Sequence, residues 1–172
     1  MRSLILLTAI AALGACSNEK TTTVKTDDGK EIKITADGDN SAESGTITFE
    51  GKDGEGGKIT FGADAVKQGL PLGMPVYPGG EVKGAFSGGD AKSMGGMATV
   101  IASDPPGKVA AYYKAEAIKR GMKVDSESTS KSDKGEMATF TAESADGGNL
   151  VITVTPGDDG KTAALIMGGK KN

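Results

Sequence analysis

The 172-residue chain contains no histidine and no tryptophan, and Cys16 is its only cysteine. Without histidine, a Ser-His-Asp or Cys-His catalytic arrangement is impossible, and so is a histidine-ligated zinc or copper site. One cysteine cannot form a disulfide within the chain. Aromatic residues are scarce, at 4% of the chain, whereas glycine is abundant, at 27 residues. The composition therefore predicts many turns and a modest aliphatic core, with no cofactor.

Other common signatures of catalysis and of nucleic-acid binding are missing as well. The sequence has no G-x-x-x-x-G-K-[ST] phosphate-binding loop. Its 20 Lys and Arg residues are interspersed among 23 Asp and Glu residues, for a net charge of -3, so no basic face is available to nucleic acid. Most acidic residues fall in predicted turns, where water keeps carboxylates ionised and chemically idle. We therefore predict neither an enzyme nor a nucleic-acid-binding protein.

The N-terminal segment has the charge and hydropathy order of a secretory signal. Arg2 is followed by an apolar run over residues 4–15, interrupted by Thr8 and Gly14. A membrane-spanning helix needs about 20 apolar residues, so this run is too short to cross a bilayer. A buried amphipathic helix would need a polar face, which the run lacks. Residues 1–15 are therefore predicted to be a signal peptide.

The apolar run ends at Leu13-Gly14-Ala15-Cys16, which resembles the lipobox of bacterial lipoproteins. The resemblance implies cleavage between Ala15 and Cys16, thioether attachment of diacylglycerol to Cys16 and, usually, acylation of the new amino group. Gly14 departs from the family pattern, in which Ala, Ser or Thr is commoner. Ordinary signal peptidase cleavage, for example after the A-x-A of residues 9–11, is the alternative.

Lipid on Cys16 would fix the mature protein to a membrane. Each buried CH₂ contributes about 0.8 kcal/mol and one chain binds only marginally, so two or three chains give effectively permanent attachment. The residue after the cysteine is Ser17. In Gram-negative lipoproteins an Asp there commonly retains the protein at the inner membrane. For such a host the resemblance therefore favours the outer membrane over the inner cell membrane, with the protein on the periplasmic face.

Period-two alternation of apolar and polar residues predicts two β-hairpins in the region 23–68, after a polar tether at 16–22. The predicted strands lie at 23–26, 31–35, 46–49 and 58–61, joined within each pair by Asp-Gly turns. A short helical turn is predicted at 63–68. The apolar faces of these hairpins are thin, so they need the rest of the chain or a partner to bury them.

Residues 69–80 contain three prolines and four glycines, which predicts an extended linker and a domain boundary. An α+β domain is predicted over 81–168, followed by a tail at 169–172. Its predicted strands lie at 81–86, 97–103, 123–126, 136–142, 149–155 and 162–167, with a mobile loop over 87–96. A helix is predicted to begin at Asp104-Pro105-Pro106, with Asp104 as its cap, and to end near Arg120 before Gly121.

The predicted fold class is α+β. One helix packs on one face of an antiparallel sheet, in the order ββαββββ, and two β-hairpins precede this unit. Val109, Tyr112, Tyr113 and Ala117 fall on one face of the predicted helix, which indicates the side that contacts the sheet.

Val76-Tyr77-Pro78-Gly79-Gly80, followed by Tyr112-Tyr113-Lys114 and Gly121-Met122, resembles a small α+β domain of uncharacterised bacterial envelope proteins. The resemblance covers roughly residues 70–168. It implies structural roles for these motifs, namely a turn into the first strand and a helix packed on the sheet. It implies no activity.

Three groups of residues are candidates for ligand binding, and each has a structural explanation that we favour. Asp37-Gly38-Asp39-Asn40 and Asp158-Asp159-Gly160 offer oxygen ligands to calcium, but neither has EF-hand spacing, and Asx-type turns explain both. Met94-Gly95-Gly96-Met97 offers two soft thioethers to Cu(I), too few for a firm site. Tyr112 and Tyr113 offer a recognition patch, although core packing is the better interpretation for at least one. We predict no metal site.

The leading hypothesis is a lipid-anchored, non-enzymatic envelope protein that serves as a binding or structural module in the periplasm. Its partners would be the membrane, through lipid on Cys16, and an envelope protein or glycan. The sheet face that the helix leaves uncovered is the expected binding surface. The alternatives are a metal-binding or small-ligand-binding lipoprotein and a carboxylate-dependent hydrolase, which needs two carboxyl groups about 5–10 Å apart in a cleft.

Overall fold

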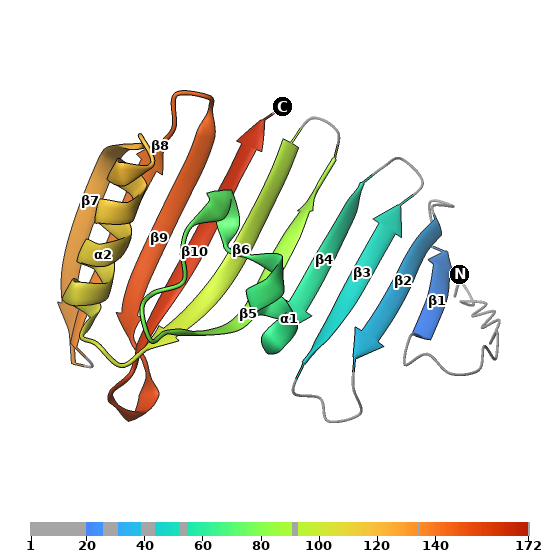
Figure 1. The fold of residues 1–172 in the computed structure, drawn as a ribbon, viewed down its shortest axis with the longest axis horizontal. Coiled ribbons are helices and arrows are strands. Elements are labelled where there is room, and N and C mark those ends of the chain that lie inside the picture. Colours follow the sequence, from blue (N-terminus) through green and yellow to red (C-terminus); the bar gives the residue numbers. More distant parts are fainter. Residues whose placement is uncertain are drawn as a thin grey trace, which may run out of the picture.

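A computed structural model describes residues 20–25, 31–38, 44–51, 55–90, 93–133 and 135–171. Ten strands in this part of the chain form one antiparallel sheet in the order β1-β2-β3-β4-β5-β6-β10-β9-β8-β7 (Figure 1). The strands are β1 (Lys20–Lys25), β2 (Glu31–Gly38), β3 (Gly45–Gly51), β4 (Gly56–Phe61), β5 (Glu81–Gly89), β6 (Ser93–Ala102), β7 (Lys123–Ser132), β8 (Gly135–Glu143), β9 (Gly148–Pro156) and β10 (Thr162–Lys171). The helical elements are α1 (Ala63–Gln68), α2 (Pro106–Lys119) and the 3₁₀ turns η1 (Pro71–Gly73) and η2 (Asp158–Gly160).

The predicted α+β fold class is wrong, because the fold is largely β. The two predicted hairpins do form, as β1 with β2 and β3 with β4, but they are not an appendage to a smaller sheet. β3 pairs with β2, and β4 pairs with β5, which makes all ten strands continuous. The pairing of β4 with β5 joins segments separated by residues 62–80, and local alternation carries no signal for such a distant contact.

The predicted mobile loop at 87–96 is also wrong, because most of this stretch belongs to β5 and β6. Gly88 pairs with Gly95 within the ladder, one pair before it ends at Gly89 and Met94. At the turn, the Asp90 carboxylate accepts a hydrogen bond from the Ser93 N–H at 2.8 Å. Glycine clusters are typical of loops. Here the glycines pair with one another within the sheet, so the sheet carries no side chains at these positions.

Helix α2 begins and ends within a residue or two of its predicted limits, although its cap differs from the prediction. Pro105 occupies the cap position and no side chain caps the helix, so the predicted role of Asp104 is wrong. Gly121 ends the helix with a φ of 76°, and the Met122 N–H donates to the Ala117 carbonyl at 3.1 Å. This is the termination that glycine favours, because the left-handed conformation carries no steric penalty without a Cβ.

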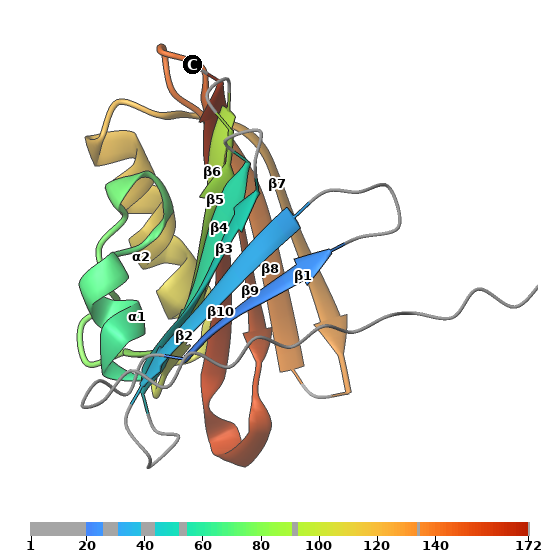
Figure 2. The same cartoon turned by 90° about the vertical axis from the view of Figure 1, so that its right-hand side faces the viewer.

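The helices cover a single face of the sheet, here called the helix side (Figure 2). The connection that contains α2 carries the chain from β6 past β10, β9 and β8 to the distant edge strand β7, and α2 contacts all four of the strands β7 to β10. Between the helix-side elements and the sheet lie the largest fully buried side chains, including Tyr113, Leu150, Ile152, Ile166, Val100, Val109 and Val154. The described core therefore sits entirely between the helical layer and strands β5–β10.

The segment 69–80 lies on the helix side and contributes Leu70, Met74 and Tyr77 to the core. Its turn η1 approaches the sheet closely where the strands carry glycine. A Cβ added to Gly168 would lie 3.1 Å from Leu72, so the missing side chain makes room for the turn. Proline and glycine predict an extended segment here, and they also suit a segment whose backbone packs closely against a sheet.

Candidate functional site: the uncovered face of the sheet

None of the helices that the structure describes lies over the second face of the sheet (Figure 2). Successive residues of a strand point to opposite faces, and directly paired residues of neighbouring strands share a face. The registers therefore identify every side chain on this second face, here called the open face. One row of paired residues crosses seven strands and is called the ridge row: Ala36, Ile47, Ile59, Phe86, Met97, Met167 and Val151.

The ridge row is apolar yet remains accessible to solvent. Phe86 is 39% exposed and its direct partner Met97 is 42% exposed. Ile59, which pairs with Phe86 on the other side, is also exposed. Scattered exposed apolar residues are normal on protein surfaces, but a contiguous apolar surface marks an interaction site. Because three neighbouring strands each contribute a large exposed side chain here, the open face meets that criterion.

A second row runs beside the ridge row and consists of glycine. Gly57, Gly88, Gly95 and Gly169 are consecutive cross-strand partners, here called the glycine row. Each stands two residues from a ridge-row residue on the same strand, so both rows lie on the open face. The ring of Phe86 leans over this row, because a Cβ added to Gly88 would lie 2.8 Å from that ring.

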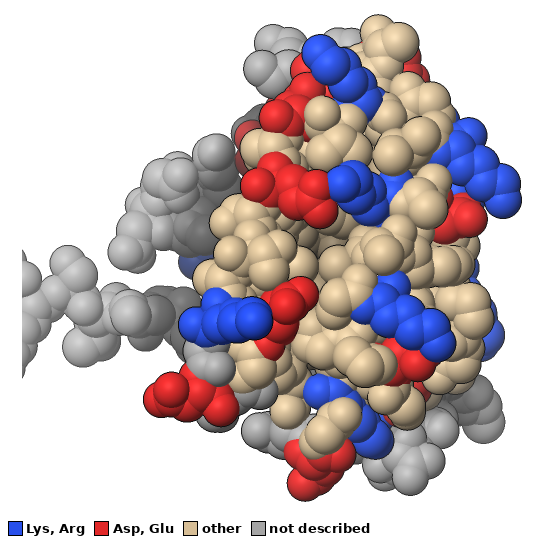
Figure 3. All heavy atoms as spheres, turned by 90° about the vertical axis from the view of Figure 1, so that its left-hand side faces the viewer, with Lys and Arg blue, Asp and Glu red and all other residues tan. Residues whose placement is uncertain are grey.

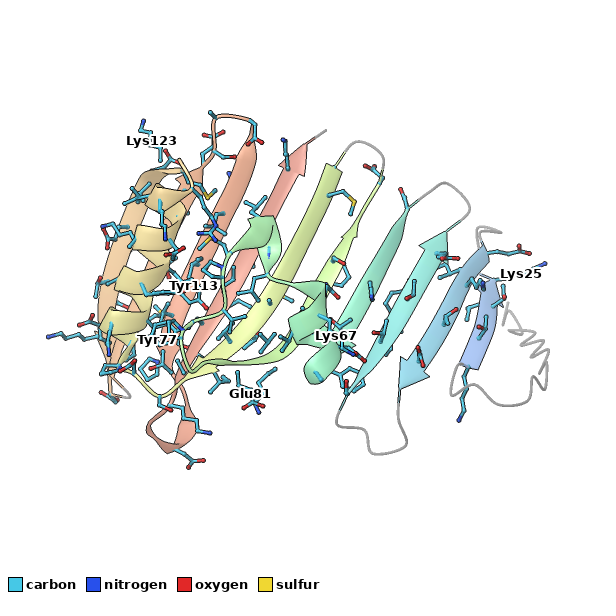
Figure 4. The ribbon with its side chains drawn as sticks, in the orientation of Figure 1. Lys25, Lys67, Tyr77, Glu81, Tyr113 and Lys123 are labelled. Atoms are coloured by element: carbon cyan, nitrogen blue, oxygen red, sulfur yellow. The ribbon has the colours of Figure 1, made fainter. Side chains whose placement is uncertain are left out.

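Charged side chains avoid the middle of the open face. In β2–β4 the charged residues Lys33, Asp37, Glu50 and Lys58 all fall on the helix side, by the same alternation. The charges that do reach the open face, such as Glu81 and Lys123, stand at strand ends or on the edge strand (Figure 4). The ridge row from β2 to β9 and the glycine row from β4 to β10 therefore form a surface without a charged side chain.

The end of the molecule formed by α2 and β7 has the opposite character. Lysine, arginine and acidic side chains alternate over this surface without a patch of either sign (Figure 3). Lys114 pairs with Glu127 across α2 and β7, while Glu116 pairs with Lys119 and Arg120 along the helix. Exposed pairs of this kind contribute little to stability, and they are typical of a solvated surface. The charged end is therefore not the candidate site.

A cluster of three tyrosines lies on the helix side, beneath and beside α2. Tyr77 and Tyr112 are 4.9 Å apart between ring centroids, and Tyr112 and Tyr113 are 5.3 Å apart, both edge to face. Burial raises the pKa of Tyr113 well above its ordinary value. The Tyr112 hydroxyl is less buried and donates to the Val76 carbonyl at 3.3 Å. The rings fill the core, in agreement with the packing interpretation of at least one of them.

The polar anchor of this cluster is Asp104. Its carboxylate accepts hydrogen bonds from the Tyr77 hydroxyl at 2.7 Å and from Lys108 Nζ at 2.9 Å. Its backbone carbonyl accepts from the Thr162 hydroxyl at 2.6 Å. The hydrogen bond to the carboxylate raises the pKa of Tyr77 to about 12, and Lys108 and then Tyr77 lower the pKa of Asp104. These contacts bind the start of α2 to segment 69–80 and to β10.

The lowered pKa of Asp104 predicts a pH-dependent contribution to stability. A carboxyl group whose pKa is lowered on folding stabilises the protein above its unfolded pKa, here about 3.8, and loses this effect as the pH falls through the folded value. We expect Asp104→Asn to lower the melting temperature at pH 7, with a difference from the wild type that shrinks below pH 4. Thermal melts of both proteins from pH 7 to pH 2.5 measure this. A difference independent of pH would contradict the ionic role of Asp104.

The structure brings few of the other candidate residues together. Met94 and Met97 lie three residues apart in β6, so they point to opposite faces and cannot share a Cu(I) ion. Asp158–Gly160 forms the turn η2, while Asp39 and Asn40 lie outside the described residues. The lipobox residues, including Ala15 and Cys16, lie outside them as well. Within the described ranges, no group of three or more His, Cys, Asp or Glu side chains is placed to hold a metal ion.

The described carboxyl groups lack the pKa pattern of an acid–base pair. A hollow of about 510 Å³ between the start of α2, β8 and the β9–β10 connection is lined in part by Glu136, Asp159 and Lys161. A general acid at neutral pH needs a raised pKa. The carboxyl groups with shifted pKa values in the described chain are all lowered, chiefly by a neighbouring lysine or arginine: Asp64, Glu81, Asp104, Glu116 and Asp146.

Sequence reasoning anticipated an uncovered sheet face but missed the two rows on it. The local signal was present in four strands, each with a glycine two residues from a large apolar residue. The pairs are Gly57 with Ile59, Phe86 with Gly88, Gly95 with Met97, and Met167 with Gly169. Only the registers show that these four pairs stand side by side.

Comparison with known proteins adds no relative: the chain matches no family model, no curated protein and no solved structure. Among the described helices, none combines the length and the hydrophobicity needed to cross a bilayer. The open face is therefore the feature on which a functional proposal depends.

Proposed function

We propose that this chain is a lipid-anchored, non-enzymatic binding module of the cell envelope, and that the open face is its binding surface. The lipobox-like segment at Cys16 supports attachment to the outer membrane, with the sheet in the periplasm. The single observation that carries the binding role is the apolar, charge-free ridge row from β2 to β9, with the glycine row beside it from β4 to β10. The partner is a protein, because an apolar surface of this size contacts side chains better than it contacts sugar hydroxyls.

The open face leaves apolar side chains in water, and a partner that covers them gains their burial energy. Burying an apolar side chain such as Phe, Met or Ile contributes about 1.5–3 kcal/mol when burial is complete. Phe86 and Met97 each keep about two fifths of their surface exposed, so a partner gains a substantial part of this energy at each position. Burying a charged group without a pair would cost several kcal/mol, and the centre of the face contains none.

Site-specific photo-crosslinking in intact cells tests the proposal. A photoreactive amino acid in place of Phe86 is expected to capture a protein, because the open face is covered in the envelope. The same amino acid in place of Ile118, which is 54% exposed on the outer side of α2, is the matched control and is expected to capture much less. Equal capture from both positions, or none from Phe86, would contradict the proposal.

A further inference from the structure

The open face is self-complementary, and we infer that its partner is a second copy of this chain, packed face to face through the two rows. This inference rests on the proposed function, because it names the partner of the same surface. It follows from the presence of a ridge and a groove side by side on one face.

The geometry of the two rows defines the symmetry of the pair. On each strand the two rows are two residues apart, which is about 7 Å along the strand. A two-fold axis that runs across the strands, midway between the rows, places the ridge row of each copy over the glycine row of the other. The pair is then isologous, as in most homodimers, and each strand faces its own counterpart.

The side chains fit this arrangement at the centre of the sheet. Gly88 is already covered by its own Phe86 ring, so the two Phe86 rings meet near the axis. Gly95 and Gly169 have only backbone atoms near the place where a Cβ would be. They leave room for Met97 and Met167 of the second copy, since equivalent strands face each other. Methionine suits such a contact because its unbranched side chain fills irregular gaps.

The two rows supply more than half of the area that a stable dimer needs. Seven strands spaced about 4.8 Å apart and two rows, each about 7 Å wide along the strands, give a surface of roughly 34 by 14 Å, or about 480 Å² per copy. A standard protein interface buries about 800 Å² per partner, and the open-face residues beside the two rows, such as Phe61, Thr99 and Leu165, would supply the rest. Two packed sheets lie about 10 Å apart with their strands within about 30° of each other, so the dimer would be a β-sandwich with helices on its outer surfaces.

A lipid surface fits the open face less well. Proteins that lie on membranes place Trp and Tyr at the interface and use Lys and Arg to attract anionic lipids. The chain has no tryptophan, its net charge is -3, and its three tyrosines lie on the helix side. The large apolar residues of the open face instead lie at the middle of a sheet whose margins carry charges of both signs.

Thiol crosslinking in intact cells tests the inference. Cys16 is the only cysteine and is proposed to carry lipid, so Met97→Cys introduces a unique free thiol. A bismaleimide with a reach of about 10–15 Å, matched to the spacing of packed sheets, is expected to convert most of the Met97→Cys protein into a covalent homodimer.

Met94→Cys, on the same strand but the opposite face, is the control and is expected to remain monomeric. Adding Phe86→Asp to Met97→Cys is expected to abolish the dimer, with thermal melting as the check on folding.

Each of three other outcomes would show that the partner is not a second copy of this chain. If Met97→Cys yields an adduct with a different protein, the open face is a binding surface and the proposed function stands, but the partner is not this chain. If the Met97→Cys thiol resists a water-soluble maleimide yet forms no protein adduct, lipid covers the face. If the thiol reacts freely with the maleimide and no dimer forms, both the inference and the proposed function fail.

Discussion

Replacing Cys16 with serine is expected to move the protein from the membrane fraction to the soluble fraction of the cell envelope. Serine has no thiol to receive diacylglycerol, so the mature chain would carry no lipid. One acyl chain binds a membrane only marginally and two or three bind effectively permanently, so losing all of them changes the partition almost completely. Fractionation followed by immunoblotting measures the effect, and mass spectrometry of the N-terminus identifies the lipid on the wild type.

The control for Cys16→Ser is Ser17→Ala, which leaves the lipobox-like segment intact and is expected to stay in the membrane fraction. Ordinary signal peptidase cleavage after residues 9–11 would leave Cys16 internal and unlipidated, with a longer N-terminus in the mass spectrum. A Cys16→Ser protein that remains membrane-bound to the same extent as the wild type would rule out the lipid anchor.

The largest effect on folding is expected from Ile152→Ala. Ile152 is 0% exposed, and on the helix side it pairs with Phe140 on one neighbouring strand and Ile166 on the other. Shortening a buried isoleucine to alanine typically costs about 2–5 kcal/mol, because a cavity remains where the side chain was. Domains are stable by about 5–15 kcal/mol, so this one change removes a large share. Urea denaturation of the purified protein measures the loss as a lower midpoint.

The matched control for Ile152 is Ile118→Ala, because Ile118 is the same residue type on the exposed side of α2. Surface substitutions usually change stability by less than about 0.5 kcal/mol, so its urea midpoint is expected to stay near that of the wild type. Equal losses at both positions would mean that the core is not where the structure places it, between α2 and the sheet.

The secondary structure could be predicted largely from the sequence, because its signals are local. Each strand is predicted at least in part, and the proline-rich start and Gly121 mark helix α2. The glycine-rich ends of β5 and β6 and the polar second half of β7 lack apolar alternation, so the predicted strands are too short there. The fold class could not be predicted from such signals. It depends on β4 pairing with β5 across residues 62–80, and on the connection from β6 to β7 passing three intervening strands.

The candidate site was predictable in outline only. An uncovered sheet face follows from having one long helix and many strands, whereas the composition of that face follows from the register. A shift of one residue would turn Phe86 and Met97 to the helix side and bring Ser87 and Gly96 to the open face. The role of Asp104 was mispredicted for a similar reason. The Asp104 carboxylate bonds to Tyr77 of segment 69–80, and this contact between residues distant in the sequence has no local signal.

Methionine oxidation offers the most direct test of the open face as the covered, functional surface. Met94 and Met97 fall between Lys92 and Lys108, so one tryptic peptide reports both residues. They are 52% and 42% exposed on opposite faces of the same strand. Both are expected to oxidise readily in purified Phe86→Asp protein, whereas in intact cells Met94 of the wild type is expected to oxidise and Met97 to be protected. Equal oxidation of the two methionines in cells would show that the open face is exposed to solvent there, and would contradict the proposed binding role.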